Sequence, residues 1–270
     1  MKKNRYRVYP LSNGKWGYVD MMGGEVIPVM YDSVWDFEEG LARVQLNGKY
    51  GFIDIGQEVI PVKYNWAEDF SDGLARVKLN GKWGCIDKTG REVIPCKYGW
   101  LGYWCEGLAQ VALNHKYGYI DTTGREVIPI KYDYATSFSE GLSLVTLNDK
   151  YGYIDTTGRE VIPIKYDDAI SFSDGLARVK LNGKYGLIDK TGRGICPCIF
   201  DFISFLTTHT AGVRFNMRWG VIGYNGDYIL PCLYDAIRID NTMIIATKLN
   251  MIYTFNLSGE YIGVQALPNV

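Results

Sequence analysis

The sequence has few of the residues and patterns by which enzymes are recognised. Only two histidines, His115 and His209, occur in 270 residues. No nucleophile–base–orienter set can be assembled around either of them. Glycine motifs that cradle phosphates, of the P-loop or dinucleotide type, are also missing from the sequence. These absences predict a protein that is not an enzyme and that uses no cofactor.

Charge and hydropathy exclude further classes. The formal net charge is −1 and the pI is about 6.2, so the composition offers no basic face for nucleic acid or for an anionic membrane. No apolar run is long enough to span a bilayer, and the basic start Met1–Arg5 is not followed by the apolar core of a secretion signal. We expect a cytoplasmic protein, and nothing in the sequence indicates a small-molecule ligand.

What the sequence does contain is a tandem repeat. An aromatic residue followed by glycine recurs about every 34 residues, at Trp16, Tyr50, Trp83, Tyr117, Tyr151, Tyr185 and Trp219. A proline keeps the same period, from Pro28 to Pro231, and a weak eighth copy starts at Tyr253. Self-similarity at a fixed period is typical of repeat architectures. The chain therefore contains about seven and a half copies of one unit.

Each unit predicts a three-stranded antiparallel meander. Residues 74–79 alternate between apolar and charged side chains, which is the period of a strand. Asn80–Gly81 then predicts a type I′ hairpin turn, and a second strand covers 82–87. Asp87–Gly90 fits a type I turn, and a third strand ends at Pro95, at a strand end or a sheet edge. The stretch from Tyr98 to Gly107 is a loop or a short fourth strand.

Three short strands bury too little surface to be stable alone, so neighbouring units must stack and share a core. The fold class is all-β. The repeat length favours an open β-solenoid or superhelix over the alternative, a closed seven-bladed β-propeller. We expect one domain over 1–270, with a capping strand at 1–12, regular repeats over 13–202, and degenerate repeats and a C-terminal cap over 203–270.

The unit resembles the bacterial WG-repeat family over practically the whole chain. The segment Lys15–Asp20, followed by Glu25–Pro28 and by Tyr31–Asp32, is close to the consensus of that family, and so is Phe172–Val179. The resemblance implies a β-rich scaffold or protein-interaction module and brings no catalytic residues with it. From about Ile203 the sequence departs from the pattern, which leaves open whether the last two units pack like the others.

Metal sites have weaker support than structural roles. Five of the six cysteines replace apolar residues of the repeat, as a buried free cysteine does. The metal alternative is Cys196, Cys198 and Cys232, whose spacing is not that of a zinc ribbon. The recurring aspartates, such as Asp87, are explained by the turns and lack the ligand run of a calcium loop. We predict no metal site, and Cys105 occupies a loop position at which it could be exposed.

Aromatic residues that recur in every unit are expected to pack between units, although a ladder of exposed rings that grips sugars is the alternative. Positions at which the copies differ are more informative. Two residues after the loop tyrosine, the second, third and fourth units carry Trp66, Trp100 and Tyr134, whereas the first and fifth carry Ser33 and Asp168. The equivalent loops of the third and first units contain two further aromatic residues, Tyr103 and Trp35.

Stacked repeats would place these loops side by side, so Trp35, Trp66, Trp100, Tyr103 and Tyr134 are the predicted binding residues. The competing interpretation is that the same side chains fill gaps beneath the loops. The predicted function is a non-enzymatic protein-interaction scaffold that binds an unidentified protein partner. The alternative is a carbohydrate or cell-wall binding module.

Overall fold

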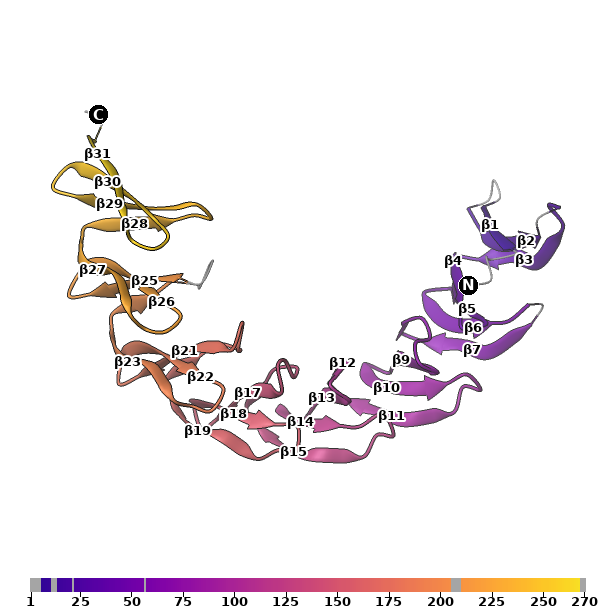
Figure 1. Ribbon diagram of the computed structural model, residues 1–270. Coiled ribbons are helices and arrows are strands. Elements are labelled where there is room, and N and C mark those ends of the chain that lie inside the picture. The colour runs from indigo at the N-terminus through magenta and orange to yellow at the C-terminus, as the bar shows by residue number, and fades with distance from the viewer. Residues whose placement is uncertain (1–5, 11–13, 21, 56, 205–209, 268–270) are drawn as a thin grey trace. The chain divides into compact units, whose positions relative to one another are not determined.

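The computed structural model describes residues 6–10, 14–20, 22–55, 57–204 and 210–267, and every element in these ranges is a β-strand (Figure 1). They divide into two compact units, one ending at Ile130 and the other beginning at Lys131. The boundary falls within strand β15. In the described ranges the chain has no helix of the length and apolarity that a bilayer span needs.

The first unit contains a three-stranded sheet and then four-stranded ones, each an antiparallel meander in chain order. The first sheet has β1 (Tyr6–Pro10), β2 (Trp16–Asp20) and β3 (Glu25–Tyr31). The second has β4 (Ser33–Glu38), β5 (Leu41–Leu46), β6 (Lys49–Ile53) and β7 (Glu58–Tyr64). The third has β8 (Trp66–Ala67), β9 (Leu74–Leu79), β10 (Lys82–Asp87) and β11 (Glu92–Tyr98). The fourth has β12 (Trp100–Cys105), β13 (Leu108–Leu113), β14 (Lys116–Ile120) and β15 (Glu126–Tyr132).

The second unit repeats this plan. Its first sheet has β16 (Tyr134–Ala135), β17 (Leu142–Leu147), β18 (Lys150–Asp155) and β19 (Glu160–Tyr166). The next has β20 (Asp168–Ala169), β21 (Leu176–Leu181), β22 (Lys184–Asp189) and β23 (Gly194–Phe200). Two more follow: β24 (Phe202–Ile203), β25 (Thr210–Phe215), β26 (Arg218–Gly223) and β27 (Tyr228–Tyr234), then β28 (Ala236–Ile239), β29 (Met243–Lys248), β30 (Met251–Asn256) and β31 (Tyr261–Ala266). The degenerate copies thus have the same strand order as the regular ones.

The predicted all-β tandem array is confirmed, and the segment left open as a loop or a fourth strand is a strand in each four-stranded sheet. No sheet of the described ranges closes on itself. None combines strands from the two ends of the chain, as closure of a ring by the terminal half-units would require. These sheets favour the open array over the closed propeller.

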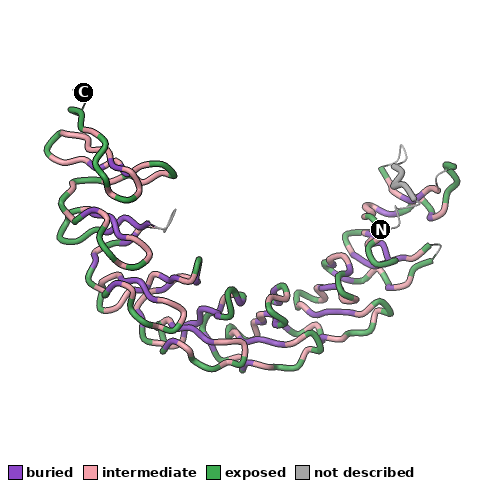
Figure 2. The backbone as a smooth tube through the Cα atoms, viewed as in Figure 1, coloured by how far each residue is buried: buried purple, intermediate pink, exposed green. Residues whose placement is uncertain are grey.

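The hydrophobic core lies between consecutive sheets. Phe52 and Ile60 of the second sheet pack against Ala75, Val77 and Ile86 of the third, and all five are fully buried. The same pairing of large and small side chains recurs in the second unit between its first two sheets. Buried residues run along the strands, and exposed ones gather at the turns (Figure 2). A shared interior of this kind is what units too small to be stable alone require.

The glycine after each recurring aromatic residue permits a close approach between strands. Opposite Gly84, strand β11 bulges: Trp83 pairs with Tyr98, whereas Cys85 pairs with Ile94. A Cβ on Gly84 would lie 2.5 Å from the carbonyl oxygen of Ile94 and 2.8 Å from the backbone nitrogen of Cys96. Only glycine fits such a position. The aromatic–glycine motif is therefore a requirement of the backbone.

That bulge corrects one prediction. Strand β11 does not end at Pro95 but continues to Tyr98. Proline is tolerated here because β11 is the edge strand of its sheet, where a missing N–H breaks no ladder. The predicted placement of the proline at a sheet edge is confirmed.

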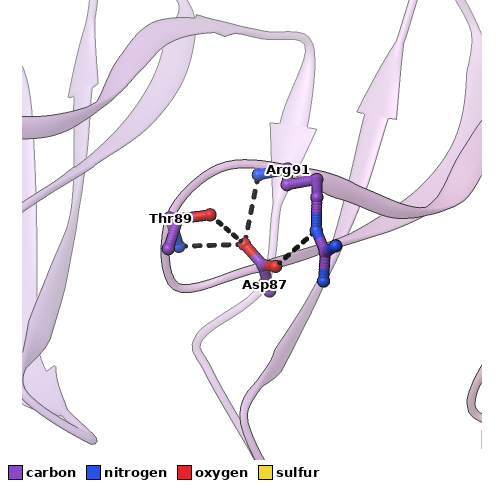
Figure 3. A network of polar contacts seen from close by, with 3 residues as sticks. All are labelled: Asp87, Thr89 and Arg91. Carbon is purple, nitrogen blue, oxygen red and sulfur yellow. Dashed lines mark hydrogen bonds and ion pairs between the residues drawn. The ribbon is translucent and has the colours of Figure 1, made fainter.

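Both predicted turns are confirmed. Asn80 and Gly81 have φ values of 50° and 79°, as a type I′ hairpin turn requires. In the next turn, Gly90 N donates to Asp87 O at 2.9 Å. The Asp87 carboxylate accepts from Thr89 N, Thr89 Oγ1, Arg91 N and Arg91 Nε (Figure 3). These bonds hold the pKa of Asp87 at about 2, with the Thr89 hydroxyl as the largest cause.

A polar side chain ties each of several sheets to the first strand of the next sheet or to the residue that follows that strand. Arginine does this in three copies, since Arg43, Arg76 and Arg178 donate to the carbonyl oxygens of Ala67, Leu101 and Ile203 at 2.6, 2.6 and 2.8 Å. In two other copies the donor is the hydroxyl of Tyr18, to Trp35 O, or of Tyr153, to Ile170 O. None of these copies carries both donors. The two donors come from facing positions of the sheet, since Arg178 lies across from Leu187, whereas Tyr153 lies across from Leu144.

Candidate binding site

Strand alternation places two tryptophans on the surface of the first unit. Trp66 begins β8 and Trp100 begins β12, and each is followed by a fully buried residue, Ala67 or Leu101. Because successive side chains of a strand point to opposite faces, both indoles are directed away from the core. Each is 44% exposed. Their backbones belong to paired strands, so the sheet fixes the points at which the two side chains are attached.

A third tryptophan completes an aromatic group. Lys78 on β9 pairs with Trp66 on one side and with Trp83 on the other, so these three side chains lie abreast on one face of the sheet. The Lys78 ammonium lies 5.5 Å from the centre of the Trp83 ring. Trp83 in turn meets Trp100 edge to face, with ring centres 6.2 Å apart. The face of the third sheet is therefore continued by the first strand of the fourth.

These side chains surround a hollow of about 600 Å³, which we call the indole pocket. Its lining consists of Asn65, Trp66, Glu68, Arg76, Lys78, Gly81, Trp83, Trp100 and Tyr103. Pockets that bind ligands have volumes of roughly 300–1,000 Å³ and combine apolar walls with a few polar groups. The indole pocket falls within this range of volume and combines aromatic walls with polar groups, and it lies open to solvent.

Arg76 lies at the back of the indole pocket and is only 6% exposed. Its guanidinium carbon lies 4.1 Å from the centre of the Tyr103 ring and 5.1 Å from that of Trp83, so the group is held between two aromatic faces. Nη2 donates to Leu101 O, and Nη1 lies 3.4 Å from Glu68 Oε2. The geometry of that ion pair does not make a hydrogen bond, so Nε and Nη1 are buried without an acceptor.

A second hollow of about 580 Å³ adjoins the first, and we call it the acidic pocket. It is lined by Glu68, Asp69, Ser71, Asp72, Leu74, Arg76, Tyr103, Trp104 and Thr122. Three residues, Glu68, Arg76 and Tyr103, line both hollows. Tyr103 is 65% exposed, and its hydroxyl donates to Glu68 Oε1 at 3.2 Å.

The two hollows differ in charge. The indole pocket has two cations, Arg76 and Lys78, against one acid, Glu68. The acidic pocket has three carboxylates against Arg76. Burial raises the pKa of one of these acids, Asp69, and Arg43, whose Nε lies 3.2 Å from Asp69 Oδ1, partly opposes that rise. Arg76 therefore stands at the border between a surface with more cations and one with more carboxylates.

Three of the five predicted binding residues, Trp66, Trp100 and Tyr103, line the indole pocket together. Trp35 is half-buried, packs against the core, and lies under the Arg43 guanidinium at 4.2 Å. It reaches Trp66 only through Tyr50, with ring centres 5.8 and 5.4 Å apart. Tyr134 is exposed but belongs to the second unit and lines neither hollow.

Sequence reasoning missed Arg76 and Trp83. Trp83 is one of the aromatic residues of the motif, and these were assigned to the core as a class, yet it is only half-buried. The alternation of residues 74–79 predicts that Arg76 lies on the charged side of its strand, facing water. One signal could have identified it, because arginine returns in the Leu-Ala-Arg-Val copies at Arg43, Arg76 and Arg178.

The cysteines and histidines form no further site in the part of the chain that the structure describes, where no three His, Cys, Asp or Glu side chains are grouped as metal ligands. Burial raises the pKa of Cys85 to about 12 and that of Cys196 to about 11, so both thiols are protonated at neutral pH. Cys105 is half-buried. His115 lies in a hairpin turn with a φ of 62°, and His209 lies outside the described residues.

Comparison with solved structures gives only weak overall likeness. A crystal structure of the eukaryotic initiation factor is 11% identical, with a TM-score of 0.40 over 98% of this chain and 86% of that one. Hsv2p of Kluyveromyces lactis is 9% identical, with a TM-score of 0.39 over 87% of this chain and 99% of that one. No conclusion about function follows from either.

None of the curated proteins matches the chain. The model of one protein family does match, and its description is "WG containing repeat". The matched segments are 16–50, 50–83, 83–117, 117–151, 151–185 and 219–241, which together make up more than half of the sequence. Each begins at one of the aromatic residues whose following glycine the backbone requires. The chain belongs to the WG-containing repeat family.

Proposed function

We propose that the chain is a non-enzymatic, cytoplasmic protein-interaction module that binds a partner protein at the indole pocket. One observation carries the proposal: three of the aromatic side chains that set individual copies apart, Trp66, Trp100 and Tyr103, line one hollow together with Trp83. Trp, Tyr and Arg dominate the energetics of protein–protein interfaces, particularly where a central pocket is surrounded by polar groups. Asn65, Glu68 and Lys78 supply such polar groups here.

Two physical features support binding at this place. Trp66 and Trp100 keep close to half of their surface in water although the repeat tolerates serine, aspartate or alanine at the equivalent position. The strands that begin with Trp66 and Trp100 are each paired with the following strand of their sheet. Little backbone conformational entropy therefore remains to be lost when a partner docks.

The test is a double variant, Trp66→Ala with Trp100→Ala, used as bait in a lysate of the native host beside the wild-type chain. The matched control is Phe202→Ala, because Phe202 takes the equivalent position in another copy, is 38% exposed, and lies outside the indole pocket. We expect the double variant to lose a protein that the wild type and the control both retain, while its melting temperature falls by no more than a few degrees.

Three outcomes would contradict the proposal. A large loss of melting temperature would show that the two indoles serve the core. Undiminished capture by the double variant would place the contact surface elsewhere. Retention of the wild type on polysaccharide or peptidoglycan, lost in the double variant and without any captured protein, would assign the pocket to carbohydrate.

A further inference from the structure

Arg76 has an unusual combination of burial and unmet hydrogen bonding. Its side chain is 6% exposed, yet Nε and Nη1 have no hydrogen-bond acceptor. Buried N–H groups of a charged side chain nearly always have one, because losing water without replacing it is costly. Nη2 alone is satisfied, by Leu101 O. Nε and Nη1 do not share one edge of the guanidinium, because Cδ lies between them, so each can donate a separate hydrogen bond to an incoming carboxylate.

The indole pocket, taken by itself, has one cation more than it has acids. Glu68 offsets one of the two cations of the indole pocket, and its Oε2 lies 3.4 Å from Nη1 without an aligned hydrogen bond. The second cation, Lys78, has its ammonium over the face of Trp83 and no ion pair among the described residues. An incoming carboxylate would balance this excess charge beside the three indoles.

Tyr103 covers this group. Its ring lies 4.1 Å from the guanidinium carbon, although 65% of the residue is exposed to solvent. Apart from the ring contact, its side chain is held by one bond, from the hydroxyl to Glu68 Oε1 at 3.2 Å, which is long for an O–H···O bond. A rotation of this side chain would open the guanidinium to both hollows at once, since Tyr103 and Arg76 line each of them.

We infer that Arg76 and Lys78 recognise the carboxylate of an aspartate or glutamate side chain within a partner peptide, beneath Tyr103 as a movable cover. The peptide places an aromatic or aliphatic residue in the indole pocket. Arg76 lines both hollows, so a partner peptide can extend past it in both directions. An internal acidic side chain is therefore favoured over the carboxylate at the end of a peptide. A lysine or arginine on the far side of the acid would face Asp69 and Asp72 in the acidic pocket. This inference rests on the proposed function and adds the chemistry of the partner.

The experiment uses the full chain and two pools of short synthetic peptides, one with glutamate fixed at the centre and one with glutamine there, with their termini blocked. The chain has seven tryptophans, so binding at the indole pocket is measured as the fluorescence change that the Trp66/Trp100 double variant loses. We expect the glutamate pool to bind and the glutamine pool to bind at least about tenfold more weakly, as the loss of a charge-assisted bond implies. Selected peptides should carry an apolar residue on one side and a basic one on the other.

Two variants locate the contact without touching the buried arginine, whose removal could disturb folding. Lys78→Ala should weaken binding of the glutamate pool several-fold and leave the glutamine pool unchanged. Lys180→Ala is the matched control, because Lys180 lies over Tyr185 at 5.0 Å in the same repeat position of another sheet. Tyr103→Phe frees the ring from Glu68 and should tighten binding, whereas a merely structural hydroxyl would give unchanged or weaker binding.

The outcomes separate the two claims. If both pools bind equally and both depend on Trp66 and Trp100, the indole pocket binds peptides but the carboxylate inference is wrong. Equal loss in Lys78→Ala and Lys180→Ala also overturns it, as does preference for peptides that end in a free carboxylate. If no peptide binds and the Trp66/Trp100 double variant still captures the cellular partner, the proposed function itself fails.

Discussion

The sheet β8–β11 and the sheet β20–β23 build the same arrangement of arginine, lysine and ring. Arg76 lies 5.1 Å from the centre of Trp83, and Arg178 lies 5.2 Å from that of Tyr185. The next aromatic residue follows at 6.2 Å in one copy, as Trp100, and at 6.3 Å in the other, as Phe202. Each of these two distances thus agrees to 0.1 Å between the two copies.

The two copies differ in the exposed residue at the start of the first strand. Trp66 begins the first strand of one sheet, and Asp168 begins that of the other. Trp83 and Trp100 are also larger than Tyr185 and Phe202 at the same positions. Side chains that hold the sheets together are thus kept while those facing water change, which is how a repeat protein varies its binding surface without altering its core.

The largest expected effect tests the backbone that the two copies share. Gly84→Ala would place a methyl group 2.5 Å from the carbonyl oxygen of Ile94, and backbone atoms cannot move aside. We expect a loss of roughly 3 kcal/mol in the free energy of unfolding, the upper range for overpacking. Gly186→Ala should lose less, because its nearest neighbour is the side-chain Sγ of Cys198 at 2.8 Å and its nearest backbone atoms lie farther away, at 2.9 Å. Urea unfolding of both variants measures the difference, and equal losses would contradict this account.

A smaller effect tests the tie between sheets. Arg178→Leu removes the donor to Ile203 O and should cost roughly 1–2 kcal/mol. Adding Leu187→Tyr recreates the pairing of Leu144 with Tyr153, whose hydroxyl reaches Ile170 O at 2.5 Å, and should recover much of that loss. Leu187→Tyr alone is the control and should destabilise by crowding the arginine. Additive effects in the double-mutant cycle would mean that the two ties are not alternatives.

The smallest effect concerns the exposed turns and is seen through pH. Because the folded pKa of Asp87 is about 2, below its ordinary value of 3.8, its carboxylate stabilises the fold above that ordinary value, and the contribution disappears as pH falls through about 2. Asp87→Asn removes it at every pH. The stability difference between wild type and variant should therefore be greatest at neutral pH and shrink steadily below about pH 4.

Asp189→Asn should behave in the same way, since the same kind of turn lowers the pKa of Asp189. Thermal melts across the acid range measure both variants. A difference from wild type that is constant down to about pH 2 would show that the carboxylate charge has no part in the turn.

Much of the local structure follows from short stretches of sequence. The predicted strands 74–79 and 82–87 match β9 and β10, and the turn at Asn80–Gly81 has the expected dihedral angles. These features are set by residues next to each other, through alternation and the steric freedom of glycine. The continuation of β11 past Pro95 was missed because it depends on a bulge opposite Gly84.

The candidate site was only half visible in the sequence. Trp66 and Trp100 stood out because they break the repeat, and they do line one hollow with Tyr103. Trp35 and Tyr134 had the same signal but do not line that hollow. The burial of Arg76 could not be predicted, because Arg76 fits the alternation of its strand and a charged residue at such a position ordinarily faces water.

The sequence by itself determined the all-β class, the period of the repeat, the turns and the need for units to share a core, since each follows from local sterics or from surface too small to bury alone. Only the tertiary structure decided which side chains meet across neighbouring sheets. Arg76 became buried, and the indoles came to surround a hollow, because strand β12 of the following sheet brings Leu101 O and Tyr103 against them. Contacts between residues about 25 positions apart depend on how one sheet packs on the next. The sequence of either sheet alone does not determine that packing.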